Sequence, residues 1–189
     1  QEANDHLSES ERTLSQAQRV ARFGTWKASL QDGISQFSPE LRELLGVPLE
    51  VELNFASASD LTWPEDRARV AASFKQCVTT RSPLWLVEHR RMHPQRGLLW
   101  LEVRAEVTYG EDGRVQRMVG ATMDVTDRHR AEDALRDSER MMSLIYDNSR
   151  DALYLARIDA EGQYPFISVN ETFLRLVDAS RTQVVSRPM

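Results

Sequence analysis

The chain has 189 residues, 41% hydrophobic and 28% charged, which is enough apolar material for a packed core and excludes a wholly disordered protein. Its formal net charge of −5 argues against a general nucleic-acid binder, because such proteins carry a basic excess. The single cysteine excludes an internal disulfide and a cysteine-rich metal site, and no apolar run is long enough to cross a bilayer. The chain begins with neither a methionine nor a secretory signal pattern, so we expect a cytoplasmic piece of a longer protein.

The first segment is polar and predicts a flanking helix from Asp5 to about Phe23. Leu14 and Val20 lie on its narrow apolar stripe. Because so thin a stripe cannot form a core alone, we expect this helix to pack against a second copy and produce a homodimer.

The next residues change to a strand pattern. Trp26, Ala28 and Leu30 alternate with polar residues, and the Asp-Gly turn at 32–33 leads to a second short strand over 34–38. This segment therefore predicts a β-hairpin.

Two helices are expected after the hairpin. Ser38 is a good N-cap for the first, which stops at Gly46. Thr62 and Glu65 fit a capping box at the start of the second, and Phe74 belongs to its apolar face.

Three strands over 84–92, 98–109 and 115–125, joined by tight turns, predict an antiparallel meander. Strict alternation on the third strand puts Val119 on the inner face. Trp100 falls on the polar face of the middle strand, so we expect another element to cover it, with the N-terminal helix as the natural candidate. The expected fold class is antiparallel α+β.

A polar connector helix is expected over 127–148, with Thr126 as its N-cap. Leu135 and Met142 belong to a short heptad pattern, which leaves a paired coiled coil and a chance spacing both open. Beyond it, residues 149–189 repeat the strand–turn–strand–helix order of the first module. The sequence therefore predicts one complete module and the start of a second.

An ordered set of short motifs resembles the PAS sensor domain, in the variant with the C-terminal PAC motif. The resemblance covers about residues 17–127, and its motifs are Gly24-Thr25-Trp26, Phe37-Ser38-Pro39-Glu40-Leu41, Pro64-Glu65-Asp66-Arg67, Glu88-His89-Arg90, Leu99-Trp100-Leu101, Asp112-Gly113-Arg114, Val119-Gly120 and Asp124-Val125-Thr126-Asp127-Arg128.

The resemblance implies a five-stranded antiparallel sheet with small helices on one face. It divides the chain into an N-terminal flanking helix (1–21), a complete PAS/PAC domain (22–126), a connector helix (127–148) and a truncated second PAS domain (149–189). It also implies a role in bacterial signal transduction.

We find no catalytic, metal or pigment signature. Cys77 lacks the Asn-Cys-Arg context of flavin-binding relatives, and residues 64–80 hold no histidine for haem, so neither cofactor is expected. His89 and His93 share a strand face without a nearby carboxylate, which favours surface or pocket-rim positions over a metal site. His129 is interpreted as a solvated connector residue.

The basic residues of the first long hairpin suggest either an anionic partner or, preferably, a solvated sheet edge protected by charge. They are Arg81, Arg90, Arg91, Arg96 and Arg104.

The leading hypothesis is a non-catalytic sensory module of a multidomain bacterial regulator, whose parent ends in a histidine kinase or in a cyclic-dinucleotide cyclase or phosphodiesterase. It would bind an unknown small molecule or a partner and pass the state to the downstream domains of the same chain. The alternative is a ligand-free interaction and dimerisation module.

Candidate residues follow from the resemblance and the connector pattern. Those expected to line a ligand cavity are Phe37, Leu41, Leu44, Phe74, Leu101 and Val119. Those expected to transmit the signal are Asp124, Thr126, Leu135 and Met142. Those expected at the dimer contact are Leu14, Val20 and Trp100.

Overall fold

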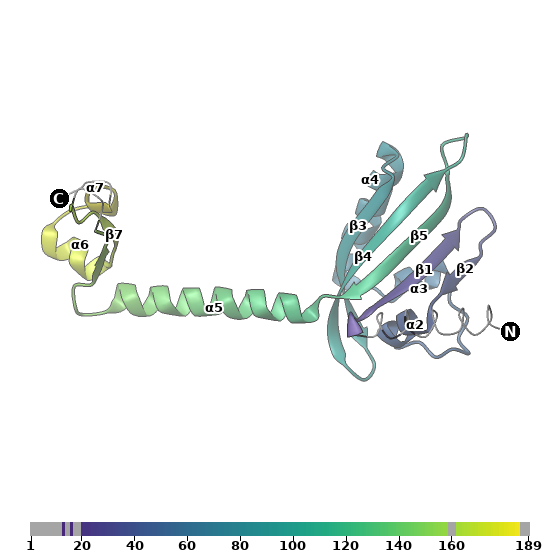
Figure 1. Cartoon of the computed structure of the whole chain (residues 1–189), viewed down its shortest axis with the longest axis horizontal. Helices are drawn as coiled ribbons and strands as arrows, with labels where there is room; N and C mark the ends of the chain where they lie inside the picture. The colour runs from purple at the N-terminus through teal and green to yellow at the C-terminus, as the bar shows by residue number, and fades with distance from the viewer. Residues whose placement is uncertain (1–12, 14–15, 17–19, 159–161, 186–189) are drawn as a thin grey trace. The chain divides into compact units, whose positions relative to one another are not determined.

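A computed structural model describes residues 13, 16, 20–158 and 162–185 of the chain. The chain divides into two compact units, the first ending at His129 and the second beginning at Arg130. Each unit is described by itself below (Figure 1).

The first unit is built on a five-stranded antiparallel sheet with the strand order β2-β1-β5-β4-β3, which confirms the expected fold class. Its strands are β1 (Phe23–Ser29), β2 (Ser35–Phe37), β3 (Leu84–His93), β4 (Gly97–Tyr109) and β5 (Val115–Asp124). Because β1 pairs with β5 in the middle of the sheet, the chain leaves the unit beside the point where its first strand begins.

Short helices cover one face of this sheet. They are α2 (Pro39–Leu45), α3 (Phe55–Asp60), the 3₁₀ helix η1 (Pro64–Asp66) and α4 (Arg67–Thr80). Helix α2 has the expected ends: Leu41 N donates to Ser38 Oγ at 3.2 Å, and Gly46 takes a left-handed conformation at φ 62°.

The expected capping box of Thr62 and Glu65 is wrong. Trp63 is the N-cap of η1, and no side chain caps either η1 or α4. Thr62 is buried at 4% exposure, so its hydroxyl faces the protein interior instead of the helix end.

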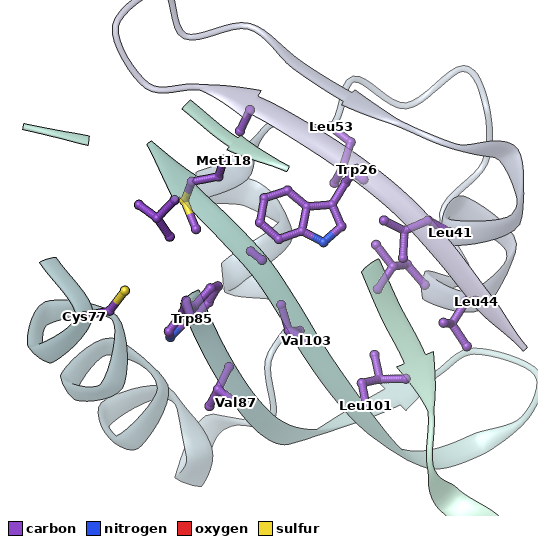
Figure 2. Packing of buried hydrophobic residues seen from close by; sticks show 14 of the residues in the cluster. Trp26, Leu41, Leu44, Leu53, Cys77, Trp85, Val87, Leu101, Val103 and Met118 are labelled. Carbon is purple, nitrogen blue, oxygen red and sulfur yellow. The ribbon is translucent and has the colours of Figure 1, made fainter. Parts of the chain in front are cut away.

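The core lies between the sheet and helices α2, α3 and α4 (Figure 2). Trp26 from β1 and Trp85 from β3 enter it from different strands, and Phe55 lies 5.8 and 6.4 Å from their respective ring centroids. Phe74 of α4 completes the cluster, 5.3 Å from Trp85. Such aromatic contacts stabilise a small domain beyond the area that they bury.

A β-bulge changes which face of β5 is inside. Thr108 pairs with Arg117 and Tyr109 with Val115, so β5 carries an extra residue at the end nearest the turn. Val115 and Met118 are therefore both buried, whereas Val119 is 41% exposed on the opposite face. Strict alternation predicted the reverse for Val119.

Helix α5 (Thr126–Asn148) follows β5 directly and continues into the second unit. The remaining elements are β6 (Tyr154–Ala156), β7 (Phe166–Val169), α6 (Glu171–Val177) and α7 (Arg181–Val185). Strands β6 and β7 pair antiparallel, which is the strand–turn–strand–helix order expected from the repeat.

The second unit is organised around Asn170, which is fully buried. Its Oδ1 accepts from Leu153 N and Phe173 N, while its Nδ2 donates to Tyr146 O and Asp151 O. One amide therefore uses its whole hydrogen-bonding capacity to join α5, the loop that follows it and α6.

The apolar face of this unit is only partly covered. Leu155 is 56% exposed and Leu176 is 75% exposed. Among the helices in the described ranges, none is both long and apolar enough to cross a membrane.

Candidate functional site

A cavity of about 70 Å³ lies in the first unit between the sheet and its helices; we call it the core cavity. Its wall is mostly aromatic and aliphatic. The lining residues are Trp26, Phe37, Leu41, Leu45, Phe55, Ala58, Ser59, Thr62, Val70, Trp85, His89, Val103 and Thr122.

The wall draws on all five strands and on helices α2, α3 and α4, so segments distant in the sequence meet around one small space. A groove of about 270 Å³ between α3 and α4 shares Phe55, Thr62 and Trp85 with the cavity wall. The groove therefore lies next to the cavity, where a small molecule could enter.

The residues predicted to line a ligand cavity divide into three groups. Phe37 and Leu41 line the core cavity, and Phe74 lines the adjoining groove. Leu44 and Leu101 are buried in the core but are not part of the cavity wall. For Val119 the prediction is wrong, because the bulge in β5 turns this side chain to the other face of the sheet and brings Thr122 to the cavity.

His89 is the titratable residue in the cavity wall. Alternation along β3 brings it to the same face as Trp85 and Val87, both of which are buried. Burial lowers the pKa of His89 to about 4, so the ring is neutral at pH 7. Its Nδ1 is buried without a hydrogen-bond partner in the described part of the chain.

The next two inward side chains of β3 have structural roles. Arg91 is 4% exposed, and its guanidinium donates to Leu45 O at the end of α2 and to Leu61 O after α3. Burial lowers its pKa to about 10, which leaves it charged at pH 7, and the carbonyl ends of two helices stabilise that charge. The prediction of a solvated basic edge is therefore wrong for Arg91.

His93 is buried and fully engaged. Its Nδ1 accepts from Gln95 N and Arg96 N at 3.1 Å, so its proton lies on Nε2, which donates to Glu43 O at 3.0 Å. His93 thus fixes the turn after β3 to helix α2.

Arg90, on the outward face of β3, is also paired. Its guanidinium binds Asp66 at 2.8 Å and Glu65 at 3.0 Å, both from η1. Hydrogen bonds from the Arg90 side chain lower the pKa of Asp66 to about 2. Arg90 is therefore held by carboxylates of η1.

A cluster on the outward face of the sheet holds the start of α5, and we call it the helix anchor: Glu88, Trp100, Arg128 and His129. The rings of Trp100 and His129 stack with centroids 4.0 Å apart. Glu88 accepts from His129 Nε2 at 2.8 Å and from Arg128 at 2.5 Å.

The contacts of the helix anchor contradict the interpretation of His129 made from the sequence and identify a residue that covers Trp100. His129 is not a solvated connector residue, because its side chain is only 20% exposed and has two partners on the sheet. Among the described residues His129 stacks on Trp100, and most of the N-terminal segment expected to cover this ring lies outside them. Burial alone would raise the pKa of Glu88, but hydrogen bonds from His129 and Arg128 outweigh it and lower the pKa.

Thr126 and Asp124 fix the junction between β5 and α5. Thr126 Oγ1 accepts from Trp100 N at 2.9 Å, so it satisfies a donor on β4 and not, as predicted, one in its own helix. Asp124 Oδ1 accepts from Thr126 N at 3.0 Å, and its other oxygen pairs with Arg96. Burial would raise the pKa of Asp124, but these bonds outweigh it and hold the pKa low.

The remaining predicted residues lie at the surface or outside the described residues. Leu135 and Met142 on α5 are 62% and 68% exposed, and Val20 is 86% exposed. Leu14 falls outside the described residues. Cys77 is buried at 6% exposure, as expected for a small core residue, and no metal-binding cluster occurs in the ranges that the structure describes.

Comparison with protein families matches residues 34–122 to the PAS fold. Among curated proteins, the chain is 32% identical over 113 residues to a blue-light-activated histidine kinase of Brucella ovis, covering 60% of this chain and 22% of that protein. It is 22% identical over 153 residues to a protein named probable diguanylate cyclase DgcE of Escherichia coli, covering 81% of this chain and 13% of that protein. The chain thus spans less than a quarter of these relatives.

Among solved structures, a sensory box histidine kinase/response regulator from Burkholderia thailandensis superposes with a TM-score of 0.57 and 32% identity, covering 68% of this chain and 96% of that one. The N-terminal domain of a diguanylate cyclase with PAS/PAC sensor from Marinobacter aquaeolei gives a TM-score of 0.50 at 19% identity, covering 57% of this chain and 98% of that one. The second likeness concerns the fold alone.

Proposed function

This chain belongs to the PAS fold family, and from that premise we propose that it is the sensory module of a larger bacterial signalling protein. In this proposal a small molecule occupies the core cavity, and its presence changes how the sheet holds the start of α5. The chain supplies recognition and transmission, and a downstream domain supplies the output chemistry.

One observation carries the proposal: Glu88 and His89 are neighbours on β3 and point to opposite faces of the sheet. Successive side chains of a strand alternate, so His89 lies in the cavity wall while Glu88 holds Arg128 and His129 of α5. A displacement of β3 at the cavity therefore acts directly on the helix anchor.

The proposed transmission route also uses Asp124, Thr126, Leu135 and Met142. The first two connect β5, β4 and α5 through hydrogen bonds, and no glycine or proline interrupts the chain from Asp124 to Met142. The exposed Leu135 and Met142 are available for pairing with another helix. Helix pairing with two discrete arrangements would convert a small shift into a switch.

The output domain is proposed from the relatives. A histidine kinase and a protein named as a diguanylate cyclase both contain a region similar to this chain, so either output fits the module. We propose the histidine kinase first, because the relatives at 32% identity are histidine kinases. We also propose that the parent is cytoplasmic and that residues 149–189 open a second PAS domain.

Ligand occupancy is tested by mass spectrometry of the purified chain. We expect native spectra to show a reproducible added mass that is lost under denaturing conditions, because the cavity wall offers apolar surface and polar groups to a small molecule. Visible absorption should show neither a haem nor a flavin band. A native mass equal to the chain mass, from preparations made with and without cell extract, would favour the ligand-free interaction module.

Homodimerisation through the N-terminal segment is the second candidate role. Val20, on the apolar stripe of this segment, is 86% exposed and is therefore accessible to a partner. Removal of residues 1–21 is expected to shift sedimentation at matched concentration toward the monomer. A chain that keeps its molecular mass after this truncation has its interface elsewhere, and the Val20→Ser variant provides the matched point substitution.

A further inference from the structure

The polar groups of the core cavity narrow the chemistry of its ligand. We propose that His89 is the recognition residue of the cavity and that the ligand is a small uncharged molecule carrying a hydrogen-bonding N–H or O–H group. This inference rests on the proposed function, because it names the ligand class of that site.

The contrast between His89 and His93 supports a recognition role. Both rings project from the same face of β3, and both nitrogens of His93 are bonded to backbone groups. Nδ1 of His89 is also buried but has no hydrogen-bond partner in the described part of the chain. An unpaired buried polar atom is costly, and a ligand that bonds to it recovers that cost.

The charges around the cavity exclude charged ligands. Among the described residues that form its wall there is no aspartate, glutamate, lysine or arginine, and His89 is neutral at pH 7. Arg91, the nearest inward cation on β3, already donates to the carbonyls of Leu45 and Leu61. A carboxylate or ammonium group would therefore enter an apolar space without a counter-ion, which is strongly unfavourable.

The size and wall of the cavity limit the ligand further. Its volume of about 70 Å³ is roughly half that of an apolar cavity that accommodates benzene. The rings of Trp26, Phe55 and Trp85 form much of the wall, so a flat ring or a short aliphatic group fits best. Pyrazole meets these conditions, because it is a small uncharged aromatic ring with an N–H donor and an acceptor nitrogen.

The test compares pyrazole with thiophene, a ring of similar size without an N–H group, by titration of the whole chain at pH 7. The ratio of the pyrazole to the thiophene dissociation constant is expected to rise about tenfold in His89→Leu, the typical effect of losing a hydrogen bond. His89→Asn keeps a polar atom near the position of Nδ1 and should restore part of the preference. Acetate should not bind measurably.

Three results of these titrations would overturn the proposal or part of it. An unchanged ratio in His89→Leu, with the His93 imidazole signals showing a folded chain, overturns the role of His89. Acetate binding comparable to that of pyrazole overturns the uncharged class. If pyrazole and thiophene both fail to bind, the ligand class proposed here is wrong, whereas the sensing function is decided separately by the native mass spectra.

Discussion

Deletion of a single residue between Arg130 and Leu135 is expected to abolish or invert ligand-dependent output in the full-length parent protein. The deletion turns the downstream helix by about 100°, which moves Leu135 and Met142 off the face they present to a pairing helix. Removal of seven residues preserves the heptad phase and should restore most of the output. The measurement is output activity, with and without ligand, across a deletion series through this region.

The control for the deletion series is ligand binding by the first unit of each variant. Each deletion variant should bind pyrazole in the core cavity as the parent does, because the helix anchor ends at His129 and the deletions begin after it. Activity that depends only on the number of residues removed, without regard to helical phase, would show that α5 is a tether. The proposal that α5 transmits the signal as a rigid helix would then be wrong.

Substitution of Gly24 by alanine is expected to have the largest effect on stability in the first unit. A Cβ at Gly24 would lie 2.3 Å from the backbone Cα of Leu41, so the start of α2 must move away from β1. Helix α2 supplies Leu41 and Leu45 to the cavity wall, and its displacement disturbs the core as well. The expected loss is about 3 kcal/mol, at the upper end of overpacking effects.

Gly33→Ala is the matched control for Gly24→Ala. No atom of the described residues lies within 4 Å of the added methyl group, but the positive φ of 68° should still cost about 1 kcal/mol. Chemical denaturation of the two variants measures the difference. If both variants lose the same unfolding free energy, α2 can move away from β1 at little cost. The position of α2 would then not determine the shape of the core cavity.

The sequence predicted the elements of the first unit because their signals are local. Alternation identified the long strands, Asp-Gly turns marked the hairpins, and Ser38 and Gly46 fixed the ends of α2. The order of motifs then predicted the sheet as a whole. None of these inferences required knowledge of a contact between distant residues.

The candidate site was harder to predict, because its groups meet across long sequence separations. Glu88 and His129 are 41 residues apart, so neither the helix anchor nor the cover of Trp100 had a local signal. The bulge that misplaced Val119 arises from pairing with β4, which the sequence of β5 does not reveal. The alternation of β3 could have predicted one residue of the site, because it brings His89 to the same inward face as Trp85.

The central claim is that the cavity and the start of α5 are coupled through β3. The most direct test is the imidazole nitrogen spectrum of the chain labelled with ¹⁵N-histidine, recorded with and without saturating pyrazole. Pyrazole should shift the signals of His89 and His129 and leave those of His93 in place, while Glu88→Gln should remove the response of His129 alone. A His129 signal that stays unchanged while His89 responds would contradict the coupling.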